Sequence, residues 1–266
     1  MSSEPPLIVK LGGSVVTRKS QFMTADEAAI TRLAREIKES NVPHLVLVHG
    51  GGSFGHPLAI EYALKEGLAE ERQLMGFALT HQAMTRLNTL VVESLTSEGV
   101  PAVSIRPSAF LTTEGGRVKA VDLEPLRRLL SLGLTPVLCG DVVADRQLGF
   151  TVLSGDQLCS RLALELGSRR AILGVDVDGL YTADPKIDRT AQLLRHVTST
   201  ELRSLLDEAR TNRGNDVTGG MTGKMREMLV FVENGGTVLV VNAAQADRLR
   251  KALKGEDFYG TRISSG

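Results

Sequence analysis

Short runs of apolar residues alternate along the chain with longer segments in which apolar residues recur every three or four positions. An unbroken apolar run is typical of a strand that is buried on both faces, and the longer spacing is typical of an amphipathic helix. The predicted strands cover residues 7–11, 45–48, 102–105, 135–139, 170–175 and 237–241. The predicted helices cover residues 24–39, 76–98, 123–132, 156–166, 199–207, 221–234 and 244–251.

Strands that alternate with helices favour an α/β fold, in which helices cover a mainly parallel sheet. Turn residues in segment 106–121 indicate a hairpin, and segments 183–190 and 212–223 read as polar loops. In open α/β sheets, ligands bind beyond the carboxyl ends of the strands. Glycines near positions 12, 50 and 179 fall at such ends, which is the main structural reason to expect an enzyme.

Composition and charge exclude several classes of protein. The chain has 266 residues, 42% of them hydrophobic, with 31 Lys plus Arg and 31 Asp plus Glu. A formal net charge of zero argues against a general nucleic-acid binder, which needs a basic surplus. No apolar stretch approaches the about 20 residues of a membrane helix, and residues 1–10 do not resemble a signal peptide. Cys139 and Cys159 have apolar neighbours and no metal-site spacing, so we expect two reduced, buried thiols in a cytoplasmic protein without a membrane partner.

Two glycine motifs supply groups that bind anions. Residues 10–14 read KLGGS, where glycines turn backbone N–H groups toward an anion and Lys10 adds a positive charge. The alternative is a tight turn beside a surface lysine. Residues 49–56 read HGGGSFGH, where three glycines expose backbone donors and a protonated His56 donates a charge-assisted hydrogen bond. His49 ends a buried strand and is better explained as a structural histidine.

Three later motifs contain charged residues at element ends. Residues 153–156 read LSGD and open a helix, so Asp156 either caps that helix or orients nearby lysines. Residues 175–185 follow a strand with two acids and a glycine, which fits a loop that contacts a nucleotide. Residues 216–224 place Lys224 in the first turn of a helix, where helix and ammonium would hold a terminal phosphate. The alternative there is a flexible loop with a solvated lysine.

The inventory of chemistry is short. The chain has no GxSxG elbow, no HExxH motif, no GxGxxG motif and no Walker A loop. What remains is lysines, one histidine and backbone amides. This set favours phosphoryl transfer, in which positioning and charge stabilisation do most of the work.

The five motifs, in this order from residue 10 to residue 224, resemble the amino acid kinase superfamily. Within it, the octet HGGGSFGH and Lys19 resemble the isopentenyl phosphate kinases. The resemblance implies a three-layer αβα sandwich with a mainly parallel central sheet and a homodimer. It implies one domain over residues 1–266, with an acceptor lobe over about 1–165 and an ATP-binding lobe over about 166–266.

The resemblance also implies a reaction and the residues that carry it. ATP, with Mg²⁺, would phosphorylate isopentenyl phosphate to isopentenyl diphosphate for isoprenoid precursor synthesis, and dimethylallyl phosphate is a further acceptor. The expected catalytic residues are Lys10, Lys19, His56, Asp156 and Lys224. Residues expected at the nucleotide are Lys10, Gly12, Gly13, Ser14, Gly52, Asp176, Asp178, Gly179, Tyr181, Gly219, Gly220 and Lys224. Residues expected at the acceptor's phosphate are Gly51, Gly52, His56 and Gly155, and no protein ligand to a metal is expected.

Alternatives concern the acceptor's organic tail and catalysis itself. A prenyl tail needs an apolar pocket, although helical spacing fits core residues equally; the candidates are Met75, Phe77, Leu79, Met84 and Leu87. A phosphonate kinase of the same build, such as a fosfomycin-resistance kinase, is the nearest alternative. UMP kinase and acetylglutamate kinase leave His56 without a task. A non-catalytic nucleotide-binding regulator would not need Lys10, Asp156 and Lys224 together.

Overall fold

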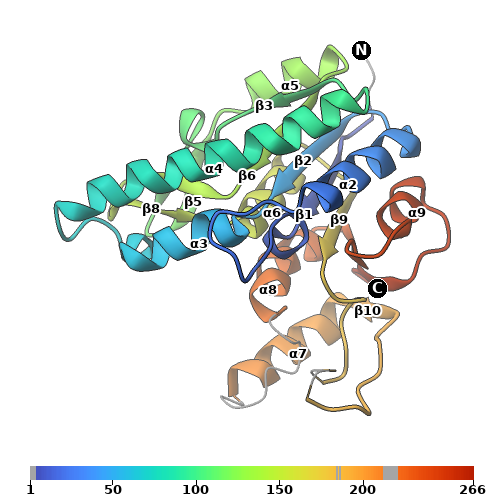
Figure 1. Cartoon of the computed structure of the whole chain (residues 1–266). Helices are drawn as coiled ribbons and strands as arrows, with labels where there is room; N and C mark the ends of the chain where they lie inside the picture. Colours follow the sequence, from blue (N-terminus) through green and yellow to red (C-terminus); the bar gives the residue numbers. More distant parts are fainter. Residues whose placement is uncertain (1–3, 184, 186, 212–220) are drawn as a thin grey trace.

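The central layer is an eight-stranded sheet (Figure 1). The computed structural model describes residues 4–183, 185, 187–211 and 221–266. The strands are β1 (Leu7–Leu11), β2 (Leu45–His49), β3 (Ala102–Ser104), β6 (Thr135–Cys139), β9 (Arg170–Val175), β10 (His196–Thr198), β11 (Thr237–Asn242) and β12 (Gly260–Ser264). Their order is β10-β12-β11-β9-β1-β2-β6-β3, and all neighbours pair in parallel except β11 and β12.

The register of β1 brings the glycine motifs together. All five residues of β1 are buried, as an apolar run in the middle of a parallel sheet requires. Leu11 is the partner of His49 in β2 and of Gly174 in β9. The loops that follow these three strands therefore start side by side at one edge of the sheet.

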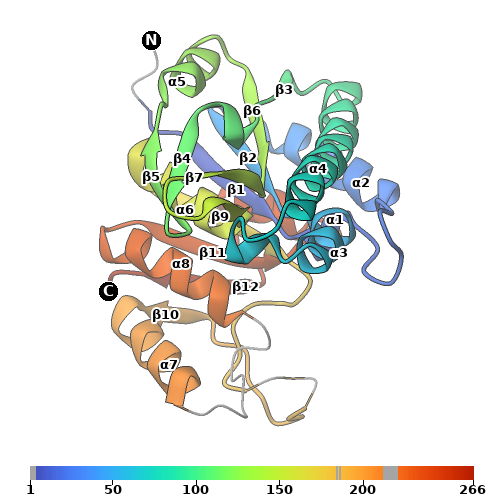
Figure 2. The ribbon, with the colours of Figure 1, turned by 90° about the vertical axis from the view of Figure 1, so that its left-hand side faces the viewer.

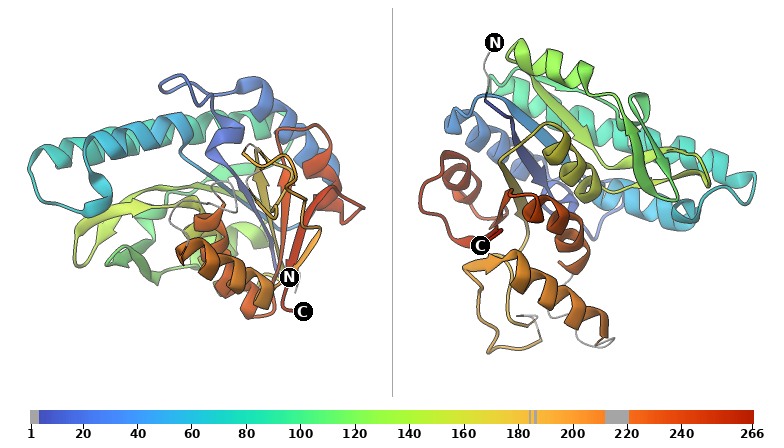
Figure 3. Two further views of the ribbon diagram at one scale, coloured as in Figure 1. Left: turned by 90° about the horizontal axis from the view of Figure 1, so that it is seen from below. Right: turned by 180° about the vertical axis from the view of Figure 1, so that it is seen from behind.

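Helices cover both faces of the sheet, so the fold is the predicted three-layer α/β arrangement. One face carries α1 (Gly13–Val16), α2 (Glu27–Ser40), α3 (Gly52–Glu61), α4 (Arg72–Ser97) and α9 (Arg248–Lys254). The other carries α5 (Glu124–Ser131), α6 (Gly155–Glu165), α7 (Ser199–Thr211) and α8 (Thr222–Glu233). Seen from below, the blue and teal helices and the orange helices lie on opposite sides of the strands (Figure 3). Within the described residues, no helix is long and apolar enough to cross a membrane.

A second, four-stranded sheet lies beside the main one (Figure 2). It contains β4 (Leu111–Glu114), β5 (Arg117–Val121), β7 (Asp141–Asp145) and β8 (Gly149–Leu153), in the order β5-β4-β7-β8. The hairpin predicted in segment 106–121 is confirmed as β4–β5. The β7–β8 hairpin was not predicted. Its first strand begins and ends with an aspartate, and such residues usually indicate a turn rather than a buried strand. Asp145 is satisfied by backbone N–H groups, for example those of Gly115 and Gly116 at 3.1 and 2.8 Å.

Helix ends differ from the prediction where side chains cap them. Asp26 accepts a hydrogen bond from the N–H of Ala29 at 3.1 Å and so begins α2 at Glu27. The helix predicted from residue 76 begins at Arg72, and short 3₁₀ turns occupy Leu64–Glu66 and Pro107–Ala109. Neither α1 nor α3 was predicted, because glycines open both.

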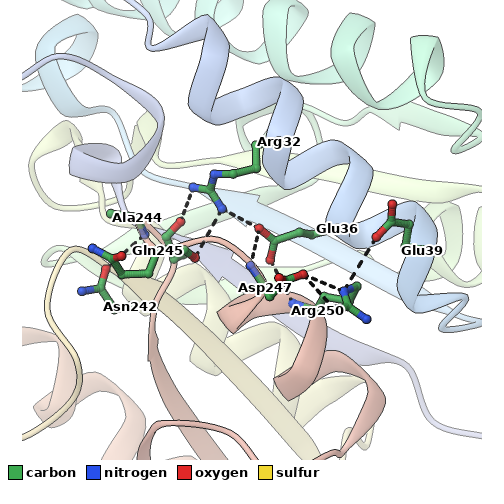
Figure 4. Close-up of polar contacts among 9 residues, drawn as sticks. Arg32, Glu36, Glu39, Asn242, Ala244, Gln245, Asp247 and Arg250 are labelled. Carbon is green, nitrogen blue, oxygen red and sulfur yellow. Dashed lines mark hydrogen bonds and ion pairs between the residues drawn. The ribbon is translucent and has the colours of Figure 1, made fainter.

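The last helix is α9, rather than the predicted segment 244–251. Glu36, buried in α2, accepts hydrogen bonds from the N–H groups of Asp247 and Arg250 at 3.2 and 3.1 Å (Figure 4). Arg32 donates to Glu36 at 2.5 Å and to the carbonyl of Ala243 at 2.6 Å. A carboxylate supplied by another helix therefore satisfies the start of α9, and this contact leaves no trace in the local sequence.

Candidate active site

A cavity of about 490 Å³ opens at the carboxyl ends of β1, β2 and β9. Most of the residues predicted at the site line it, although they come from five separate motifs. These are Lys10, Gly12, Gly13, Ser14, Lys19, Gly51, Gly52, His56, Gly155, Asp156, Asp176 and Lys224. The structure thus brings the predicted anion-binding groups to one hollow.

The two glycine loops touch each other through their backbones. A Cβ atom on Gly13 would lie 2.3 Å from the backbone nitrogen of Gly52. Gly52 has φ +48°, which favours glycine. Thr17 joins the loops, since its hydroxyl donates to the carbonyl of Gly13 at 2.7 Å and accepts from the N–H of Ser53 at 3.1 Å. Side chains are excluded here, so backbone forms this wall of the cavity.

Lys10 and Asp156 form an ion pair at the floor of the cavity, with Nζ 2.8 Å from Oδ1. Only 4% of the Lys10 side chain is exposed. The N-cap of α6 is Ser154, whose hydroxyl accepts from the N–H of Gln157 at 3.0 Å. Ser154, rather than Asp156, therefore caps the helix, and the carboxylate of Asp156 pairs with Lys10.

Lys224 faces the same cavity from the first turn of α8. Burial lowers the pKa of its ammonium group, and the charges of Lys10 and Lys19 act in the same direction. Asp156 and Asp176 partly offset this shift. The group is thus a partly desolvated cation, which interacts strongly with an anion that enters the cavity.

Lys19 lies at the rim, where its Nζ is 2.7 Å from Oδ2 of Asp176. Burial raises the pKa of Asp176, but the hydrogen bond from Lys19 and its charge more than compensate, so the pKa lies below its usual value. The Lys19 side chain is 65% exposed. Its pair with Asp176 is therefore weak enough to exchange for a phosphate.

His56 lies in α3 and is partly shielded from solvent by the cavity wall. Burial lowers the pKa of its imidazole, and the positive charges of Lys224 and Lys10 lower it further. The neutral form of His56 is therefore favoured in this structure, which differs from the protonated donor expected from the sequence. A phosphate dianion beside His56 would reverse this effect, because a nearby negative charge favours the imidazolium.

Asp176 and Val177 of the predicted nucleotide loop line the cavity, whereas Asp178, Gly179 and Tyr181 do not. Asp178 accepts a hydrogen bond from Nδ2 of Asn242 at 3.0 Å, and Leu180 donates its N–H to the hydroxyl of Thr261 at 2.8 Å. Gly179 is packed against that same hydroxyl, and the hydroxyl of Tyr181 is 3.5 Å from Asp178. Gly219 and Gly220 lie outside the described residues.

The apolar lining differs from the predicted one. Of the five helical candidates, only Met84 lines the cavity. Leu79 and Leu87 pack in the core, Met75 is 60% exposed, and Phe77 stacks on His81 and tilts against Phe150. The apolar part of the lining is Pro57, Ala59, Met84, Val152, Leu153, Val177 and Met221. Sequence reasoning missed most of these residues because it predicted neither α3 nor β8.

A buried charge cluster also reaches the cavity and was missed. Asp141, which lines the cavity, accepts from Arg106 at 2.8 Å and lies 2.9 Å from Nδ1 of His81. Burial raises the pKa of Asp141 above its usual value, although Arg106 and His81 act against this. Its position after Gly140, at the end of a predicted strand, was the available signal.

The arrangement suits phosphoryl transfer. Three lysines, one histidine and glycine amides surround the hollow, and positively charged groups of this kind stabilise charge that spreads over phosphate oxygens. Each lining carboxylate already contacts a cationic side chain: Asp156 contacts Lys10, Asp176 contacts Lys19, and Asp141 contacts Arg106. Within the described part of the chain, no cluster of three or more His, Cys, Asp or Glu is arranged to hold a metal ion.

Known proteins resemble this chain over nearly its whole length. Residues 5–242 match the profile of the Amino acid kinase family. The chain is 44% identical to an isopentenyl phosphate kinase of Methanothermobacter thermautotrophicus, with 97% of this chain and 98% of that protein covered. It is 34% identical to an isopentenyl phosphate kinase of Thermoplasma acidophilum, with 97% and 99% covered. An X-ray structure of isopentenyl phosphate kinase superposes with TM-score 0.86 at 42% identity, with 97% and 99% covered.

Proposed function

The chain is a phosphotransferase of the amino acid kinase family, and we propose that it transfers the γ-phosphoryl group of ATP to isopentenyl phosphate. The products are ADP and isopentenyl diphosphate, a precursor of isoprenoids. One observation carries the proposal. In a chain 44% identical to an isopentenyl phosphate kinase, Lys10, His56 and Lys224 line one cavity.

The acceptor brings its own nucleophile. An oxygen of its phosphate forms the new bond to the γ-phosphorus, while the bond from that phosphorus to the β–γ bridging oxygen breaks and its electrons leave with ADP. The attacking oxygen is already anionic, so no strong base is needed. Lys10 and Lys224 would stabilise the transferring group, Asp156 would hold Lys10 in place, and His56 would donate to the acceptor's phosphate.

Mg²⁺ is proposed as part of the nucleotide substrate. The lining carboxylates already contact lysine or arginine side chains. In phosphoryl-transfer enzymes, Mg²⁺ is commonly held by substrate phosphates together with one or two carboxylates. The ion would neutralise phosphate charge. Among the described residues, Asp156 and Asp176 contact Lys10 and Lys19, so they are the carboxylates that would help to hold it.

Two lobes divide the binding work in this proposal. Residues of about 1–165 would hold the acceptor through Gly51, Gly52, His56 and Gly155, and residues of about 166–266 would hold ATP. Glycine amides from the first lobe also reach the nucleotide. The residues proposed at ATP are Lys10, Gly12, Gly13, Ser14, Gly52, Asp176, Asp178, Gly179, Tyr181, Gly219, Gly220 and Lys224.

Three further expectations accompany the function. Dimethylallyl phosphate is proposed as a second acceptor, because its tail has the same number of carbons. A homodimer stays a prediction of the family resemblance, to be checked by sedimentation. A cytoplasmic location is proposed because both cysteines are free and buried, as is usual in a reducing compartment.

The proposal is tested by the chemical identity of the product. ³¹P NMR of the protein with Mg-ATP and isopentenyl phosphate should show the acceptor's single resonance replaced by two coupled resonances of a diphosphate. A phosphonate acceptor is not favoured, since the relatives at 44% and 34% identity are named isopentenyl phosphate kinase. If isopentenyl phosphate keeps its single resonance while the protein phosphorylates another acceptor, the proposal is overturned.

A further inference from the structure

His49 is fully buried at the end of β2, directly before the glycine loop, and it does not line the cavity. Its ring nevertheless contacts that loop. Nδ1 lies 3.1 Å from the carbonyl oxygen of Gly50, and Nε2 lies 3.0 Å from Nδ2 of Asn88 in α4. The hydroxyl of Ser104 in β3 donates to Oδ1 of Asn88. Three elements thus converge on one peptide of the loop.

These contacts determine which atom donates and which accepts in each of the three hydrogen bonds. The Gly50 carbonyl only accepts, so Nδ1 of His49 must carry a hydrogen. Burial lowers the pKa of His49 to about 4, so the ring is neutral and Nε2 is an acceptor. Nε2 then requires the amide group of Asn88 as donor, which leaves Oδ1 to accept from Ser104. The bonds run in one direction, from Ser104 through Asn88 and His49 to Gly50.

We propose that Ser104, Asn88 and His49 form a hydrogen-bond relay that aims the N–H of Gly51 at the phosphate in the cavity. The described chain has no cis peptide bond, and in a trans peptide the carbonyl and the following N–H point in opposite directions. Holding the Gly50 carbonyl against His49 therefore turns the Gly51 N–H away from the ring. Gly51 lines the cavity, and within the described part of the chain its N–H has no hydrogen-bond partner.

The relay adds positioning residues to the reaction and rests on the proposed function. An aimed backbone donor is effective because it costs no reorganisation when charge develops on the phosphate. Glycine peptides can adopt more conformations than those of other residues, so the contact with His49 adds to the packing that fixes this one. The sequence predicts a structural role for His49; in this proposal its structural contact sets the geometry of acceptor binding.

The first test observes the histidine directly and needs no activity. In protein labelled with ¹⁵N-histidine, two-bond ¹⁵N–¹H spectra assign the tautomer of each of the five histidines. The relay predicts that His49 stays neutral with the proton on Nδ1 between about pH 6 and 9. A proton on Nε2, or an imidazolium in this range, would overturn the relay whether or not the protein phosphorylates isopentenyl phosphate.

The second test separates positioning from folding. His49→Phe keeps the ring's volume and removes both hydrogen bonds, whereas His49→Asn keeps an amide donor near the place of Nδ1. We expect kcat/KM for isopentenyl phosphate to fall about 30-fold in His49→Phe, with KM for ATP changed less than about 3-fold, and to recover at least about 5-fold in His49→Asn.

Ser104→Ala should show the same pattern more weakly, with KM for isopentenyl phosphate raised about 3- to 10-fold. Ser40→Ala is its control, because the hydroxyl of Ser40 likewise donates a hydrogen bond, to the carbonyl of Ile37, away from the cavity. Equal effects of both serine variants on kcat/KM would overturn the relay. Wild-type protein inactive on isopentenyl phosphate would instead refute the proposed function, and the tautomer would then decide the relay.

Discussion

The ammonium nitrogen of Lys10 lies 2.8 Å from Oδ1 of Asp156, and this pair joins the end of β1 to the first turn of α6 beneath the cavity. A buried lysine needs such a partner, because an uncompensated charge away from water is costly. In the proposed function, the contact places a cation where two anionic substrates would otherwise repel each other.

Asp156→Asn removes the charge with little change of shape. We expect kcat to fall about 100-fold, because Lys10 is no longer held in place, and the free energy of unfolding to fall by about 2–3 kcal/mol. Steady-state kinetics and urea unfolding measure the two effects. Full activity in a folded variant would contradict the positioning role of Asp156.

Lys224→Ala should lower kcat about 1000-fold with a small change in KM for ATP, because the ammonium stabilises the transferring group more than the bound nucleotide. Lys224→Arg should recover little of the lost kcat, since a planar guanidinium does not replace a compact ammonium. Lys38→Ala serves as control, because Lys38 lies on α2 and its ammonium donates to the Gly99 carbonyl outside the cavity. Equal kcat values for the two alanine variants would remove Lys224 from the mechanism.

The location of the site was predictable because three apolar runs end in glycine or acidic motifs. A parallel sheet brings such ends together, and the register of β1 with β2 and β9 does so here. The resemblance to the amino acid kinases, rather than spacing, placed Lys10 and Asp156 in one site, although they lie far apart in the sequence. No rule of sequence gave their 2.8 Å contact.

The apolar part of the cavity was not predictable in the same way. It depends on α3 and on the β7–β8 hairpin, where glycines and buried carboxylates mask the usual periodicity. The local sequence predicts an exposed Asp145, yet its side chain is buried and accepts hydrogen bonds from backbone N–H groups. Glu36 likewise begins α9 from a distant helix. Such tertiary contacts override local pattern.

His56 should take up a proton when the acceptor binds. Its pKa lies below 6.5 in this structure because of burial and of Lys224 and Lys10, and a phosphate dianion raises it. A group that is more protonated in the complex binds ligand more weakly as pH rises through its pKa in the complex. Titration calorimetry of isopentenyl phosphate in two buffers of different ionisation enthalpy measures this uptake at pH values above about 7.

His56→Gln is the comparison for this uptake, since it keeps a hydrogen-bond donor and cannot titrate. We expect the variant to bind the acceptor without the additional proton and with affinity less dependent on pH. The same proton uptake in both proteins would show that the proton goes to the acceptor or to another group, and His56 would lose its role.

Gly13→Ala should disrupt the contact between the two glycine loops. The added Cβ would lie 2.3 Å from the backbone nitrogen of Gly52, and this clash can be relieved only if the two loops move apart. We expect the free energy of unfolding to fall by about 2–3 kcal/mol. Gly223→Ala is the stability control, because a Cβ there meets nothing within 4 Å. Equal stabilities in urea would contradict the close packing of the loops.

Both cysteines should be inert in the folded protein. Burial raises the pKa of Cys139 and of Cys159 to about 12, so neither forms appreciable thiolate near neutral pH. An aromatic disulfide reagent at about pH 8 should release no thiolate from native protein and two equivalents per chain in urea. Rapid reaction of one native thiol would show that its region opens.

The most direct test of the central claim is the choice of acceptor. ADP release by the purified protein with Mg-ATP should be compared for isopentenyl phosphate, dimethylallyl phosphate and fosfomycin at equal concentrations. The account predicts the highest kcat/KM for isopentenyl phosphate, with turnover on the order of 1–100 per second. Activity on fosfomycin alone, or on none of the three, would contradict it.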